Sequence, residues 1–145
     1  MKIAALVILG LVMTSSVSAA QDGSGRWYEY AHVYATVANF TDASIIAESD
    51  AALAPFGLRR DSSGTTYPHS LVPGIFASYK ARNSLAAAMI VQGSRPGCLV
   101  FSVTNYEQQA AGLAQSAAAA IEVRFHNAFG KSLRLFSDAA CTHAL

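Results

Sequence analysis

The sequence has few charged side chains, and those it has are balanced in sign. Only 13% of the 145 residues are Asp, Glu, Lys or Arg, with ten basic residues against nine acidic ones. Proteins that bind nucleic acids or anionic membranes carry a basic footprint, which this chain lacks. We therefore expect neither as the main partner. The apolar fraction of 52% argues against extensive disorder and indicates one compact domain.

Motifs for catalysis and for metal binding are also missing. The chain has no G-x-S-x-G turn, no H-E-x-x-H pair, no paired-carboxylate motif and no glycine loop with the lysine that binds phosphate. The four histidines, at positions 32, 69, 126 and 143, are scattered, and two cysteines alone do not form a structural zinc site. We expect no catalytic residue, no metal and no cofactor.

The chain has one long apolar run, at its extreme N-terminus. Lys2 precedes eleven residues without a polar side chain, from Ile3 to Met13, and small residues follow up to position 20. This order is typical of a secretory signal peptide. Because a membrane span needs about 20 apolar residues, we expect no stable membrane anchor. The sequence predicts that residues 1–20 are removed, that 21–145 form the domain, and that the protein is exported to the periplasm or the extracellular space.

Cysteine is nearly absent too, and the only two, Cys98 and Cys141, are expected to form one disulfide. An exported protein meets an oxidising compartment, where an even pair of cysteines is typically bridged. The bond would close a loop of about 40 residues and stabilise the fold by about 4 kcal/mol in the chain-entropy model. The alternative is a reactive thiol, but neither cysteine lies in a cysteine-protease signature.

The first half of the domain predicts a strand and a helix followed by a loop. Polar and apolar side chains alternate over 26–38, which favours a strand, although a helix is a competing interpretation. A helix is expected to begin after Thr41, which can cap it, and to end near Pro55 and Gly57. Residues 59–73 contain one glycine and two prolines among serines and threonines, so they are expected to be a loop.

The second half predicts a meander, a helix and a last strand. Three short strands are expected first, and a capping box at 104–107 then predicts a helix that runs to about Phe129. The strands expected in this half are 74–80, 85–92, 98–104 and 132–137. The whole order predicts an α+β fold: one antiparallel sheet of four to five strands with both helices on one face, a split βαβ or ferredoxin-like variant. A Cys98–Cys141 bond fits the simplest version poorly, because it needs an extra strand or a tail that folds back.

The strand at 26–38 carries the most informative surface of the sequence. Its even positions are Tyr28, Tyr30, His32 and Tyr34, and its odd positions are mostly small and apolar. If helices cover the small side, the aromatic row lies on an open sheet face, where rigid amphipathic rings suit recognition of a protein or a sugar. The alternative is that the row itself belongs to the core.

Two weaker features are candidates for chemical sites. Glu122 and His126 lie four residues apart on the expected outer face of the second helix, a spacing that suits helix stabilisation better than half a metal site. His69 lies in the expected 59–73 loop near two serines and would be the base of a hydrolase site there.

The function expected from these observations is binding. A small, neutral, disulfide-bridged exported domain without a convergent catalytic set suits a non-catalytic protein that recognises another protein, as an inhibitor or immunity factor does. The alternatives are a small exported hydrolase with its site in the 59–73 loop and a structural component of an envelope complex.

Overall fold

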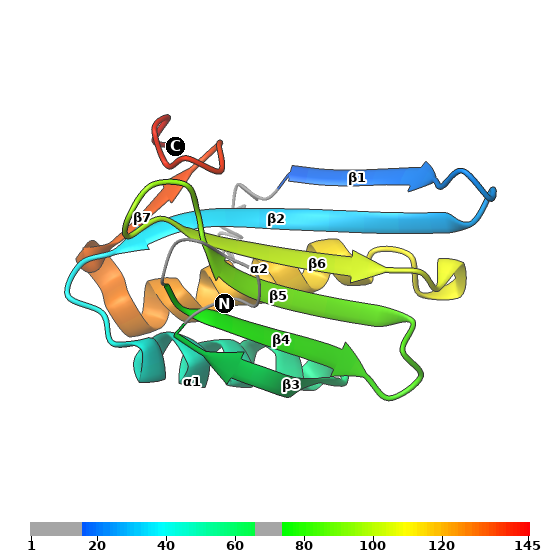
Figure 1. Ribbon diagram of the computed structural model, residues 1–145, viewed down its shortest axis with the longest axis horizontal. Coiled ribbons are helices and arrows are strands. Elements are labelled where there is room, and N and C mark those ends of the chain that lie inside the picture. The colour runs from blue at the N-terminus through cyan, green and yellow to red at the C-terminus, as the bar shows by residue number, and fades with distance from the viewer. Residues whose placement is uncertain (1–15, 66–73) are drawn as a thin grey trace, which may run out of the picture.

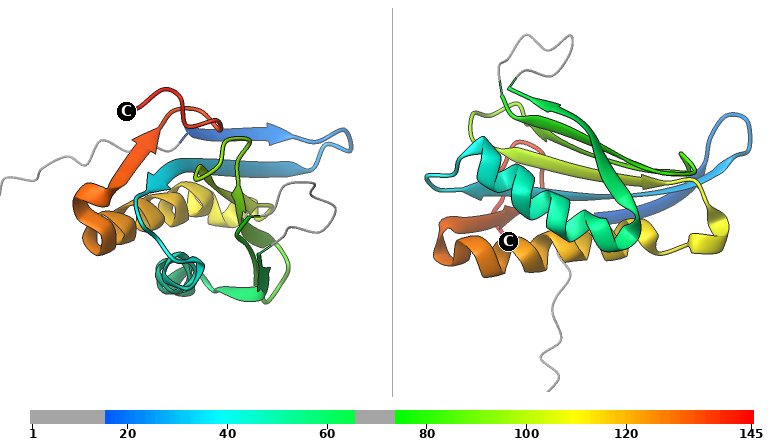
Figure 2. Two further views of the ribbon diagram at one scale, coloured as in Figure 1. Left: turned by 60° about the vertical axis from the view of Figure 1, so that its left-hand side comes forward. Right: turned by 90° about the horizontal axis from the view of Figure 1, so that it is seen from below.

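The computed structural model describes residues 16–65 and 74–145, and it shows one antiparallel sheet with two helices (Figure 1). Seven strands form the sheet, in the order β1-β2-β6-β5-β4-β3, with β7 also paired to β2. The strands are β1 (Ser16–Gln21), β2 (Trp27–Val37), β3 (Leu58–Gly64), β4 (Phe76–Ala81), β5 (Ala86–Gln92), β6 (Leu99–Asn105) and β7 (Leu133–Phe136). The helices are α1 (Asp42–Leu53) and α2 (Leu113–Phe129), and both cover the same face (Figure 2). The α+β class and the placement of the helices are as predicted.

Strand β2 organises the sheet. It pairs along one side with β6, and along its other side with two strands in turn. Its first half, from Trp27 to His32, pairs with β1, and its last four residues, from Tyr34 to Val37, pair with β7. The clean alternation over 26–38 thus predicted a strand correctly, and the competing helix is wrong.

The core lies between the sheet and the helices. Ala31, Val33 and Ala35 of β2 are at most 4% exposed, because α2 packs directly against this side of the strand. Phe125 of α2 meets Phe101 of β6 edge to face, with ring centroids 5.1 Å apart. Small residues on both surfaces let the helix approach the sheet closely, which explains the alanines in the first half of α2.

Helix α1 begins and ends as its sequence predicts. The Thr41 side chain accepts a hydrogen bond from the Ser44 backbone N–H at 3.2 Å, and the Ser44 hydroxyl in turn accepts from the Thr41 N–H. After a short 3-10 turn at Ala54–Phe56, Gly57 has a φ of +71°, a left-handed conformation that glycine adopts without strain.

The predicted start of the second helix is wrong. β6 continues to Asn105, a 3-10 turn follows at Gln108–Ala110, and α2 begins only at Leu113. Its N-cap is Gly112, which makes no side-chain cap hydrogen bond. The helix begins later than the capping box predicts, because a carboxylate from β2 accepts the hydrogen bonds of its first N–H groups, as described below.

The sheet is larger than predicted, and the ferredoxin-like variant is not matched. Four strands lie between the two helices in the chain, whereas the split βαβ arrangement has two. One of these, β3, occupies much of the predicted 59–73 loop. It is an edge strand whose residues after Leu58 are mostly exposed, so it shows no apolar alternation, and its register shifts between Arg60 and Ser62. The other extra strand, β1, lies within residues 1–20 except for its last residue, Gln21, and we expect residues 1–20 to be removed.

The predicted disulfide is present. Cys98 and Cys141 are bonded, with Cα atoms 5.7 Å apart. The geometry works because the tail folds back: β7 runs beside β2, and Phe136 forms a bridge with Ala144. The turn that follows β7 then lies across the sheet from the helices (Figure 2).

Within the described ranges, 16–65 and 74–145, no helix has both the length and the apolar character needed to cross a membrane.

Candidate functional site

The tyrosine row lies on the sheet face that the helices leave open. The odd residues of β2 point into the core, so the even residues point to the opposite face, because side chains alternate along a strand. The row is half-buried between its neighbours on β6: Thr104 is paired with Tyr30, and Val100 with Tyr34. The alternative that the row forms the main core is wrong, since that core contains the odd residues.

The rings of the row form a continuous ladder. Tyr28 stacks on Tyr30 with centroids 6.0 Å apart, Tyr30 lies 5.2 Å from His32, and His32 stacks on Tyr34 at 5.8 Å. These separations are typical of aromatic pairs that stabilise each other beyond their buried area. A ladder of this kind presents rigid contact area whose side-chain entropy is already lost.

Two residues that the sequence analysis missed extend the ladder beyond Tyr28. Tyr106 lies 6.3 Å from Tyr28 and is 38% exposed. The Arg26 guanidinium sits over its ring, 4.5 Å from the centroid, which is a cation–π arrangement. The sequence predicts a helix start at Tyr106, whereas the residue lies in the short link between β6 and the 3-10 turn at Gln108–Ala110.

The middle of the row carries an uncharged histidine. His32 Nδ1 lies 2.9 Å from the Ser102 hydroxyl on β6, and burial lowers the pKa of His32. The ring is therefore neutral at neutral pH. Burial, followed by the nearby Asp138 carboxylate and Tyr30, raises the pKa of Tyr34, so its phenol also stays protonated.

The disulfide supports one end of the row. Cys98, Phe136 and Cys141 form a small buried cluster on the open face, and Tyr34 packs against it. Phe136 is directly opposite Tyr34 in the β2–β7 register. The bond therefore holds the tail against the aromatic row and limits how far this end of the face can rearrange.

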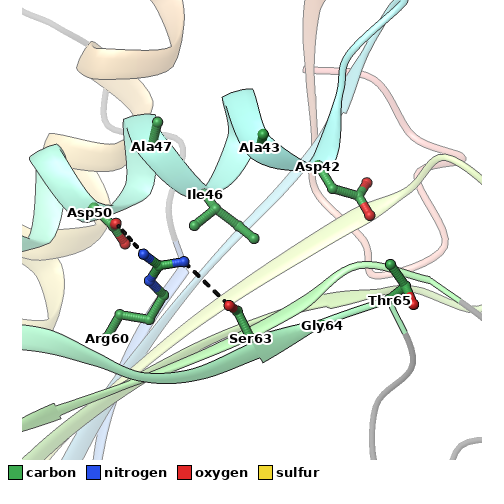
Figure 3. Close-up of a pocket in the computed structure, with 9 residues that line it drawn as sticks. All are labelled: Asp42, Ala43, Ile46, Ala47, Asp50, Arg60, Ser63, Gly64 and Thr65. Atoms are coloured by element: carbon green, nitrogen blue, oxygen red, sulfur yellow. Dashed lines mark hydrogen bonds and ion pairs between the residues drawn. The ribbon is translucent and has the colours of Figure 1, made fainter.

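A second candidate is a groove between α1 and the edge strand β3 (Figure 3). It has a volume of about 430 Å³. Arg60 crosses it, with Nη2 3.3 Å from Asp50 Oδ2 and Nη1 donating to the Ser63 hydroxyl at 3.2 Å (Figure 3). Apolar side chains of α1, such as Ile46, line the same space. Beneath the groove's edge, burial and then the Asp50 carboxylate raise the pKa of Tyr79.

The groove does not assemble a hydrolytic site from its described residues. Ser63 accepts a hydrogen bond from an arginine that is itself neutralised by Asp50, and none of the described lining residues is a histidine. A nucleophilic serine needs a base within hydrogen-bond reach. His69, the base considered from the sequence, lies outside the described residues.

Glu122 and His126 do not share a surface. Glu122 is 4% exposed and faces inward, whereas His126 is exposed, so the prediction of an outer-face pair is wrong. The Glu122 Oε1 atom is buried, without a hydrogen-bond partner among the described residues. In the described part of the chain, no three histidine, cysteine or acidic side chains are grouped where they could share a metal ion.

A buried polar network explains where α2 begins. Glu29 of β2 accepts hydrogen bonds from the backbone N–H groups of Gly112 at 2.9 Å and Ala114 at 3.1 Å, and from Asn105 Nδ2 at 2.8 Å. Burial alone would raise the pKa of Glu29, but these donors together outweigh it and hold the pKa below its usual value. A carboxylate at a helix N-terminus is favoured by the helix dipole. Glu29 is therefore structural, and it ties the strand of the tyrosine row to α2.

The open face therefore carries a row of five neighbouring rings, four on β2 and the fifth, Tyr106, just after β6. No protein-family model matches this chain, and no curated protein matches its sequence.

Proposed function

We propose that this chain is a small exported, non-catalytic protein that binds another protein through the open face of its sheet. The observation that carries the proposal is the ladder of five rings from Tyr106 to Tyr34, four of them half-buried and Tyr106 exposed, on the face that neither helix covers. Tyrosines supply large contact area at a small entropy cost, and they are enriched at protein interfaces. A disulfide-bridged domain is typical of oxidising compartments, which supports export.

The alternatives from the sequence have less support. The hydrolase needs a base within hydrogen-bond reach of a nucleophile. Among the described residues that line the α1–β3 groove, no histidine lies beside Ser63 to act as that base. A structural envelope component would also use an interaction surface, but it would be permanently assembled with its partners and would be purified together with them. Reversible binding distinguishes the proposal from this alternative.

The experiment begins with a tagged mature protein, used to capture partners from the host envelope and culture fluid. A captured protein is then purified and its affinity is measured by calorimetry. The Tyr30→Ala/Tyr34→Ala double variant is expected to bind at least about 100-fold more weakly, because central aromatic residues at interfaces often contribute 2 kcal/mol or more each.

The matched control is Val123→Ala, which truncates a side chain 41% exposed on α2, on the helix side of the molecule. It should leave the affinity unchanged. Both variants are checked for an intact fold by NMR. A folded double variant that binds as tightly as the wild type would overturn the proposal. Equal losses of affinity in the double variant and in the control would also overturn it.

A further inference from the structure

A pocket opens at the Tyr34 end of the aromatic row, where β2, β7 and the tail meet. It has a volume of about 360 Å³ and receives side chains from three separate parts of the chain, among them Thr36, Arg95 and Arg134. Thr36 and Arg134 are directly opposite in the β2–β7 register, so their side chains share one face of the sheet. That face is the open one, because Thr36 has the same parity as the tyrosines.

The pocket brings together two arginines without a carboxylate partner. Among the described residues, neither Arg95 nor Arg134 forms an ion pair. Arg95 Nη1 donates to the backbone carbonyl of Cys141 at 3.4 Å, which orients the guanidinium over the tail. A guanidinium has five N–H donors, and this bond uses one of them. Two uncompensated cations lining one small pocket repel each other unless an anion lies between them.

The acidic residue of the tail is already engaged elsewhere. Asp138 accepts hydrogen bonds from the backbone N–H groups of Ala140, Thr142 and His143, and from the Thr142 hydroxyl at 2.8 Å. The hydrogen bond from the His143 N–H, with those of Thr142 and Ala140, lowers the pKa of Asp138 to about 2 against the opposing effect of burial. The carboxylate therefore organises its own turn.

The disulfide and the turns beside it fix the backbone that carries Arg95, and pairing with β2 fixes the backbone of Arg134, while both side chains are exposed. The loop that carries Arg95 is closed by the Gly93 N–H to Cys98 O bond at 2.7 Å and the Cys98 N–H to Arg95 O bond at 3.0 Å. Cys98 is then bonded to Cys141 in the tail. Arg134 is held on β7 by the sheet. A fixed backbone lowers the entropy cost of bringing the two guanidinium groups to one anion.

We propose that this pocket binds an oxyanion, with Arg95 and Arg134 as the charged donors. Guanidinium groups recognise planar carboxylates and phosphates through paired hydrogen bonds. The group bound is either the carboxylate of an acidic residue on a protein or a phosphate, free or esterified. The pocket adjoins the tyrosine row, so a partner lying on the row would reach it with an acidic side chain. Binding of a free oxyanion in this pocket does not require such a partner.

The test is an NMR titration of the oxidised protein with acetate and, separately, with inorganic phosphate, each compared with sodium chloride at equal ionic strength. The signals followed are the Nε–Hε groups of Arg95 and Arg134 and the amide of Cys141. Saturable shifts confined to this pocket are expected with at least one oxyanion. Arg95→Gln and Arg134→Gln, each made alone, should weaken binding about tenfold or more, since a hydrogen bond to a charged group contributes about 1.5–3 kcal/mol.

The matched control is Arg82→Gln, an exposed arginine in the β4–β5 turn, which should bind as the wild type does. Binding of acetate identifies a carboxylate as the ligand class, and binding of phosphate alone identifies a phosphate. The inference is overturned if chloride produces the same shifts, if no shift saturates, or if the control loses as much affinity as the two pocket variants. Because no partner enters this titration, its failure would leave the proposed protein-binding function standing. Failure of the partner-binding experiment would likewise leave the anion site standing.

Discussion

Replacing Glu29 by glutamine should destabilise the protein far more than a surface substitution of the same kind. Glutamine keeps the shape of the side chain but turns one acceptor into a donor. Glu29 Oε2 accepts from the Gly112 N–H, and Oε1 accepts from Asn105 Nδ2 and from the Ala114 N–H. The variant therefore leaves at least one buried donor without an acceptor and removes the charge at the start of α2.

The expected cost follows from these contacts. Losing one hydrogen bond to a charged group and leaving a buried donor unsatisfied costs about 2–3 kcal/mol, and the helix-dipole contribution adds up to about 1 kcal/mol. We therefore expect Glu29→Gln to lower the free energy of unfolding by about 3 kcal/mol at pH 7. That is a large part of the stability of a typical domain.

Urea denaturation followed by circular dichroism measures this loss. The control is Glu48→Gln, which removes the carboxylate of a partly exposed ion pair with Arg124 and should cost less than about 1 kcal/mol. A Glu29→Gln variant within the error of the control would refute the reasoning, because it would mean that the buried network contributes no more than a surface pair.

The pH dependence supplies an independent check with a defined sign. The pKa of Glu29 is lower in the folded protein than the ordinary glutamate value of 4.5. Its stabilising contribution is therefore fully present above the unfolded pKa and is lost as the pH falls through the folded pKa. The stability difference between wild type and Glu29→Gln should be constant near neutral pH and shrink below about pH 4.5. A difference that grew on acidification would contradict this assignment.

Two further predictions concern the disulfide and the core. Cys98→Ala/Cys141→Ala removes a bond that joins residues 43 apart, so it should lower the free energy of unfolding by about 4 kcal/mol; a thermal melt unchanged from that of the oxidised wild type would contradict this. Phe125→Ala empties a site packed edge to face against Phe101 and Phe129 and should cost about 3–5 kcal/mol in urea denaturation, and a cost below about 1 kcal/mol would show that the core collapses around the gap.

Local signals predicted the elements that depend on local contacts. The alternation along β2 was readable because one face is small and apolar and the other aromatic, and the α1 cap is formed by residues three apart. That the four tyrosine-row residues share one face was predictable for the same reason, since side chains alternate along a strand. Whether that face was open depended on where the helices packed, which the sequence left undecided.

The features missed depend on distant contacts or on the lack of an apolar pattern. The N-terminus of α2 is capped by Glu29, 83 residues away from Gly112, so the local capping box misled the prediction. Strand β3 shows no alternation because it is an exposed edge. Arg95 and Arg134 line the same pocket only because the tail folds back and is bonded to the Arg95 loop through Cys98–Cys141. Neither arginine lies in a sequence motif.

The position of β1 bears on what the expected removal of residues 1–20 would do to the sheet. Strand β1 ends at Gln21, so removal of residues 1–20 would take almost all of it and leave the β2 edge from Trp27 to His32 without a neighbour. Such an edge exposes a row of backbone donors and acceptors that readily pair with another chain. Precursor and processed protein would then differ in self-association, and the start site chosen for recombinant expression would decide which behaviour a laboratory observes.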